Sequence, residues 1–84
     1  MPIFVRRVGS SRVDFWGGVR SADNGGSVTL FSRVGKKGTF KVLKKTVKLG
    51  ARGYFEVHVS ASNASKRQFK FGFGKARSII VTAH

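Results

Sequence analysis

The feature that most constrains the fold is a regular alternation of phenylalanine with polar or small residues in the segment 66–78. Phe69, Phe71 and Phe73 occupy every second position, and Lys70 lies between two of them. Successive side chains of a β-strand point to opposite faces, so one face carries the rings and the other carries the lysine. Burying an unpaired lysine would cost several kcal/mol. We therefore predict that the three rings point into a core and that Lys70 faces solvent.

A period of two residues recurs along the rest of the chain, between turns that contain glycine. The apolar residues of these alternating segments are Val13, Phe15, Val28, Leu30, Phe55, Val57, Val59, Ile79 and Val81. Half-buried strands have this period. Asn24-Gly25 favours a tight hairpin, because both residues accept a positive φ. The pattern predicts a single all-β domain, a sandwich or small barrel of about six to eight strands.

The segment 39–49 permits two interpretations. Phe40, Leu43 and Val47 have helical spacing with lysines on the remaining face, which is typical of a basic amphipathic helix at a membrane surface. The β-branched content favours strands instead. In this preferred interpretation the chain breaks near Lys44-Lys45, and the inward residues on either side of the break are Phe40, Val42, Val47 and Leu49.

The chain carries a large excess of positive charge. Its 84 residues include 17 Lys and Arg, the only acidic residues are Asp14, Asp23 and Glu56, and the formal net charge is +14. A charge of this size strengthens encounters with polyanions and says little about fold. We therefore expect the partner to be an anionic polymer or an acidic protein surface: a cell-wall polymer, nucleic acid, anionic lipid headgroups or a virion surface.

The cations form two clusters along the sequence that we interpret as polyanion-binding residues. The first contains Lys36, Lys37, Lys41, Lys44, Lys45 and Lys48, and the second contains Lys66, Arg67, Lys70, Lys75 and Arg77. The alternative is that these charges only keep a small spacer domain soluble, because a high net charge also favours solubility.

Three aromatic residues, Trp16, Phe31 and Tyr54, are out of phase with the core positions of their strands. We expect them to be available for contacts, although each could equally cover a sheet edge. Sheet surfaces that bind RNA combine such rings with cations. The rival prediction is therefore a small nucleic-acid-binding β-barrel, associated with RNA, the ribosome or DNA.

Two known RNA-binding motifs match only in part. The segment 52–59 begins like a ribonucleoprotein motif but has Phe55 where a small residue is expected and Glu56 where a stacking aromatic belongs. The segments 37–42 and 69–75 resemble cold-shock sequences, but they lie too far apart for that family. Neither motif therefore favours the rival prediction.

The sequence contains few residues of the types that catalyse reactions, and their spacing does not indicate an active site. Glu56 and His58 share one face of a predicted strand, an arrangement more typical of a solvated sheet face than of an acid/base pair. The chain has two histidines and no cysteine, which matches no zinc spacing and allows no disulfide. We expect a non-enzymatic protein with no cofactor, no metal and no small-molecule substrate.

The order of short motifs is similar to that of a known module. The pattern consists of Val28 and Leu30, an aromatic at Phe40, Gly53 and Phe55, alternating aromatics at Phe69 and Phe71, and Ser78 followed by Val81. It resembles the Ig-like β-sandwich modules of exported and cell-surface proteins of actinobacteria, over about residues 11–83. The resemblance implies an Ig-like sandwich of about seven antiparallel strands over residues 11–84, with an N-terminal arm or edge strand at 1–10. It also implies a structural, polymer-binding or interaction role.

The sequence leaves the location open between two cases. No run of about 18 apolar residues suggests a transmembrane segment, and the first residues lack the apolar run of a signal peptide. We expect an extracellular or cell-surface module if the chain is excised from a longer exported protein. Otherwise we expect an intracellular protein or a virion decoration or fibre component, a role that Ig-like modules also serve.

Overall fold

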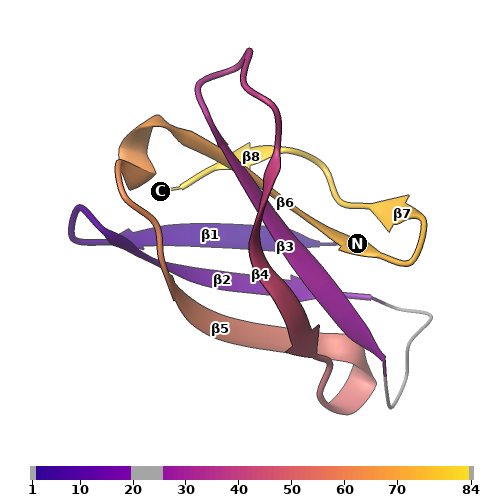
Figure 1. Cartoon of the computed structure of the whole chain (residues 1–84). Coiled ribbons are helices and arrows are strands. Elements are labelled where there is room, and N and C mark those ends of the chain that lie inside the picture. The colour runs from indigo at the N-terminus through magenta and orange to yellow at the C-terminus, as the bar shows by residue number, and fades with distance from the viewer. Residues whose placement is uncertain (1, 20–25, 84) are drawn as a thin grey trace.

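The computed structural model describes residues 2–19 and 26–83, and these form strands joined by turns (Figure 1). The strands are β1 (Ile3–Val8), β2 (Arg12–Gly18), β3 (Ser27–Val34), β4 (Lys41–Lys48), β5 (Tyr54–Ser60), β6 (Arg67–Phe73), β7 (Ala76–Arg77) and β8 (Val81–Thr82). Two single 3-10 turns, η1 (Ala51–Gly53) and η2 (Ala64–Lys66), precede β5 and β6. The described residues contain no α-helix, so the all-β prediction is confirmed. The predicted hairpin at Asn24-Gly25 lies outside them.

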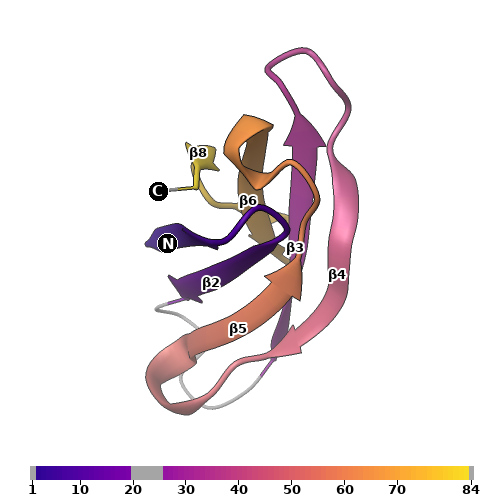
Figure 2. The ribbon, with the colours of Figure 1, turned by 90° about the vertical axis from the view of Figure 1, so that its left-hand side faces the viewer.

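The strands form two antiparallel sheets that pack face to face. One sheet has three strands in the order β1-β2-β5, and the other has five, in the order β4-β3-β6-β7 with β8 also pairing with β6. Figure 2 shows the two layers, with β2 and β5 on the left and β3 and β4 on the right. The fold is therefore a small β-sandwich, as predicted, and β1 lies at an edge of the three-stranded sheet.

Phenylalanine rings fill the space between the sheets. Phe69 and Phe71 of β6 are both 0% exposed, and Phe15 of β2 lies edge-on to both of them. Phe55 of β5 completes the group, with its ring centroid 5.0 Å from that of Phe71. Each fully buried ring contributes about 1.5–3 kcal/mol relative to an exposed one. The predicted inward orientation is confirmed for Phe69 and Phe71, while Phe73 is only partly buried against the core.

Glycine at position 17 is required by the close approach of two of these rings. A Cβ atom at Gly17 would lie 2.7 Å from the Phe55 ring and 2.8 Å from the Phe71 ring. Because these contacts are shorter than real Cβ atoms tolerate, a side chain here would force the rings apart. The rings therefore pack directly on the backbone of β2.

The segment 39–49 is a strand, as preferred, but its register differs from the prediction. β4 is continuous from Lys41 to Lys48, and its pairing with β3 shifts twice, between Val28 and Leu30 and between Leu30 and Phe31. The expected break near Lys44-Lys45 is thus an irregularity within one strand. Each shift places one extra residue in β4, and the two together leave its side-chain alternation in phase on either side.

Two residues predicted to point inward do not. Val42 is 56% exposed, and Phe40, which precedes β4, lies outside the core. Leu43 packs against the core in place of Val42, because the two shifts cancel and Leu43 keeps the parity of the buried Val47. Val47 and Leu49, which follow the irregularity, are buried as predicted.

The C-terminal alternation is also interrupted. Ile79 is 71% exposed, although its spacing from Val81 predicted that both would pack inward; Val81 is partly buried in β8. The Ser78 hydroxyl accepts a hydrogen bond from the Phe71 N–H at 2.9 Å and occupies the position of a backbone partner. This side-chain contact separates β7 from β8, and the strand period does not continue across it.

Substitution of two phenylalanines tests the assigned orientation. Phe69→Ala should lower the free energy of unfolding by about 3–5 kcal/mol, because it leaves a cavity in the core. Phe31→Ala, on the outer face of the neighbouring strand, should cost about 1 kcal/mol or less. Urea denaturation measures both, and equal costs would contradict the assigned faces.

Candidate polyanion-binding surface

The described carboxylates all lie on one of the two sheets, which also carries Arg6, Arg7 and Arg12. Among the described residues, both carboxylates, Asp14 and Glu56, belong to the three-stranded sheet. The strands and turns of the five-stranded sheet carry only cations, namely Arg33, Lys36, Lys37, Lys41, Lys44, Lys45, Lys48, Lys66, Arg67, Lys70, Lys75 and Arg77. The structure thus brings the two predicted clusters together on one sheet, where no described carboxylate offsets their field.

A row of alternating cations and rings crosses the outer face of this sheet. Arg33 Cζ lies 4.4 Å from the centroid of the Phe40 ring, and Lys70 Nζ lies 4.2 Å from the same centroid. Lys70 Nζ is also 5.7 Å from the centroid of Phe31, over which Arg77 Cζ lies at 5.4 Å. We call these five residues the cation–aromatic ladder. Cation–π contacts of this kind are worth about 0.5–1 kcal/mol each at exposed sites.

Strand register explains why the ladder forms. Phe31 of β3 lies directly opposite Lys70 of β6, and Gly72 of β6 lies opposite Arg77 of β7. The Arg77 side chain covers Gly72 closely, since a Cβ atom there would be 2.6 Å from Arg77 Nη1. Glycine at this position lets Arg77 fold back over the sheet and reach Phe31.

Neutral acceptors fix two of the ladder's cations. Arg33 Nε donates to Gln68 Oε1 at 2.8 Å, and its Nη1 donates to the Gly38 carbonyl at 3.3 Å. Arg77 Nη1 donates to the carbonyls of Gly74 and Ala76, both at 2.8 Å. These bonds hold the guanidinium groups without neutralising them, so they remain available to an anion.

The remaining predicted residues surround the ladder, with one exception. Lys36 and Lys37 lie in the β3–β4 turn, Lys66 ends η2, Lys75 lies in the β6–β7 turn, and Lys41, Lys44, Lys45 and Lys48 are exposed on the edge strand β4. Lysines on an edge strand also prevent pairing with other chains, which is a structural role. Arg67 differs, because its guanidinium bonds to Ser62 and Ser32 and pins the turn before η2.

Sequence reasoning missed two members of the ladder. Arg33 was not among the predicted binding residues, although it has the same parity as Phe31 and is out of phase with Leu30. Phe40 was predicted to be buried because a break was expected near Lys44-Lys45, but the parity of β4 is preserved and Phe40 lies on the face opposite Val47. The parity of β3 could have revealed Arg33, and uninterrupted alternation from Val47 could have revealed the outward position of Phe40.

The three aromatic residues proposed for contacts do not share a surface. Phe31 belongs to the ladder, but Trp16 and Tyr54 are on β2 and β5 of the opposite sheet. Their rings stack on each other, with centroids 5.5 Å apart and planes inclined by 20°. The half-exposed Tyr54 and its partner are therefore separated from the basic surface by the thickness of the sandwich.

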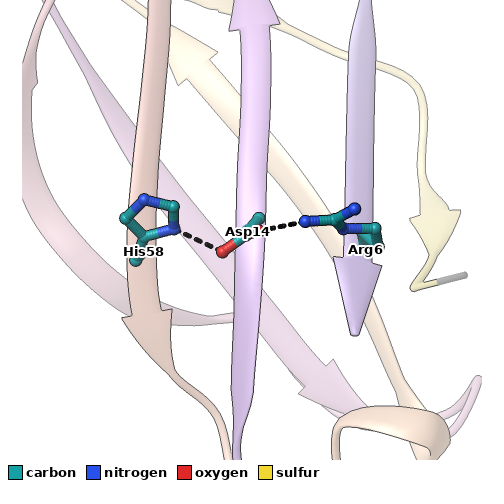
Figure 3. A network of polar contacts seen from close by, with 3 residues as sticks. All are labelled: Arg6, Asp14 and His58. Atoms are coloured by element: carbon teal, nitrogen blue, oxygen red, sulfur yellow. Dashed lines mark hydrogen bonds and ion pairs between the residues drawn. The ribbon is translucent and has the colours of Figure 1, made fainter. Parts of the chain in front are cut away.

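The outer face of the three-stranded sheet carries a polar network instead (Figure 3). Asp14 of β2 accepts a hydrogen bond from Arg6 Nη2 at 2.9 Å and bonds to His58 Nδ1 on its other side. The bonds from His58 and Arg6 hold the pKa of Asp14 below its ordinary value of 3.8. His58 thus pairs across strands with Asp14, and Glu56 on its own strand makes no hydrogen bond or ion pair among the described residues.

The described residues contain neither a metal-binding cluster nor a membrane-spanning helix. Nowhere in residues 2–19 and 26–83 do three or more His, Asp or Glu side chains gather as a metal site would require. The same ranges hold no helix of the length and apolarity needed to cross a membrane. Comparisons with protein-family models, curated proteins and solved structures found no match.

The Asp14 network predicts a specific acid sensitivity. Since the folded-state pKa of Asp14 lies below its unfolded value, the network stabilises the fold above pH 4 and loses this effect as the pH falls through the folded-state value. Asp14→Asn should therefore flatten the decline of Tm between pH 5 and pH 2, as measured by circular dichroism. Glu56→Gln is the matched control and should keep the wild-type slope; a wild-type slope in Asp14→Asn would contradict the assignment.

Proposed function

We propose that this protein is a non-enzymatic Ig-like β-sandwich that attaches to an anionic polymer or acidic assembly partner. The contact surface is the outer face of the five-stranded sheet. The observation that carries the proposal is the cation–aromatic ladder, which lies among further lysines and has no described carboxylate on its sheet. A field of one sign over a broad surface raises the local concentration of polyanions.

The strand order supports the Ig-like part of the proposal. The first, second and fifth strands form one sheet, and the fourth, third, sixth and seventh form the other. In Ig-like sandwiches strands A, B and E pair in one sheet, and C, F and G pair in the other, with an added C′ strand beside C in some members. The eight strands fit this arrangement if β7 and β8 together correspond to strand G. This agreement supports an Ig-like arrangement of the strands.

The geometry favours binding by charge over binding by base stacking. Cations lie over the rings of Phe31 and Phe40, so a base could stack there only after displacing them. Trp16 and Tyr54, the other candidates for stacking, lie on the opposite sheet. Nucleic-acid platforms need rings and cations on one surface. Nucleic acid is thus one of several polyanions that this surface can bind, with affinity set by charge density.

Removing ladder charges should weaken binding more than removing other charges. The double variant Lys70→Gln/Arg77→Gln should lose about tenfold in affinity for poly(glycerol phosphate) and reduce the log–log salt slope by about two. Arg12→Gln removes an exposed cation from the three-stranded sheet and should change affinity less than about twofold. Fluorescence anisotropy over a salt series measures both, and equal losses would favour a role for the charges in solubility alone.

A comparison of polymers separates the two binding modes. At fixed ionic strength, single-stranded RNA, duplex DNA and poly(glycerol phosphate) should bind in the order of their charge densities. Trp16→Ala should leave that order unchanged, because its ring is remote from the ladder. A strong preference for RNA that Trp16→Ala removes would contradict the proposal and favour a nucleic-acid-binding protein that stacks bases.

A further inference from the structure

A hollow of about 400 Å³ lies at one end of the five-stranded sheet. The turn between β3 and β4 projects from this end (Figure 1). The residues that line it are Ser32, Arg33, Val34, Gly38, Thr39, Lys41 and Arg67. They include the cations Lys41 and Arg67 and two hydroxyls, but no carboxylate. The guanidinium of Arg33 lies over the Phe40 ring on the outer face of the sheet. The hollow is therefore a concave site with one sign of charge, of a size that encloses small ligands.

Arg67 is held in this site without a counter-charge. Its Nε donates to the Ser62 carbonyl at 2.5 Å, its Nη1 to Ser32 Oγ at 3.0 Å and its Nη2 to Ser62 Oγ at 3.3 Å. All three acceptors are neutral, and Ser32 is only 3% exposed. Because a guanidinium has five N–H donors, two remain for a ligand. A half-buried cation held rigidly by neutral partners is prepared to bind an anion at a low entropic cost.

Lys41 adds to the same field. It lies opposite Ser32 in the pairing of β3 with β4, and Arg67 bonds to the hydroxyl of the same serine. Neither Lys41 nor Arg67 forms an ion pair with a described residue. An anion that contacts both cations would reduce their mutual repulsion.

We propose that this hollow binds a phosphate monoester group. A monoester carries a charge of about −1.5 to −2 near pH 7 and three acceptor oxygens, which suit the two remaining N–H donors of Arg67 and the ammonium group of Lys41. A diester offers one charge and fewer free oxygens, so the site should discriminate between the two. The site depends on Arg67 and Lys41, neither of which belongs to the ladder, and the rest of the hollow would hold the group to which the phosphate is attached.

The test uses glycerol 3-phosphate and dimethyl phosphate as matched monoester and diester at fixed ionic strength. NMR titration should show saturable shifts of the Gly38 and Thr39 amides with the monoester, at about tenfold or greater preference over the diester. Lys41→Gln should weaken monoester binding by about tenfold. Lys44→Gln removes the same charge from the same strand outside the hollow and should change affinity less than about twofold.

Further outcomes distinguish this proposal from the polyanion-binding surface. Lys70→Gln/Arg77→Gln should keep monoester binding even though polymer binding is weakened. Affinity should fall from pH 7.5 to pH 5, because a phosphate monoester has its second pKa near 6. Equal binding of monoester and diester, or the same loss in Lys44→Gln as in Lys41→Gln, would overturn the proposal while leaving the ladder untouched.

Discussion

Burial of phenylalanine rings between the two sheets is the constraint on which the rest of the molecule depends. Phe15 and Phe55 from one sheet meet Phe69 and Phe71 from the other, all within the core. Because side chains alternate along a strand, fixing Phe69 and Phe71 inside leaves Lys70 outside. The same alternation in β3, with Leu30 inside, turns Phe31 outward. The basic surface thus takes its position from the packing of the core.

The concentration of positive charge on one sheet raises the electrostatic free energy of the folded protein, and an anionic partner can lower it. Like charges concentrated on one sheet repel each other and reduce the stability of the free protein. Cation–π contacts with Phe31 and Phe40 offset part of this repulsion, and they also restrict the motion of Lys70 and the two arginines. The rings therefore act as supports for the cations. An anionic polymer on the outer face, and a phosphate group in the hollow, would each lower the remaining electrostatic cost.

The two-residue alternation of apolar and polar residues correctly predicted side-chain orientation wherever a strand continues without interruption. The orientations of Phe69, Phe71 and Phe15 follow from alternation alone, and so does the outward position of Lys70. Prediction was wrong for Val42 and Phe40, because a break was expected where two cancelling shifts keep β4 in phase, and for Ile79, where the Ser78 hydroxyl interrupts the last strand. The pairing of His58 with Asp14 and the ladder itself depend on register between distant strands, which no single segment encodes.

The most direct test of the account is to locate a bound polyanion on the protein. Amide and lysine side-chain NMR signals, followed as poly(glycerol phosphate) is added at low salt, report which sheet the polymer contacts. We expect the perturbed signals to lie on β3, β4, β6 and β7 and to include Lys70, while the Trp16 indole signal stays constant. Perturbation centred on Trp16 and Tyr54, with the five-stranded sheet unaffected, would contradict the account.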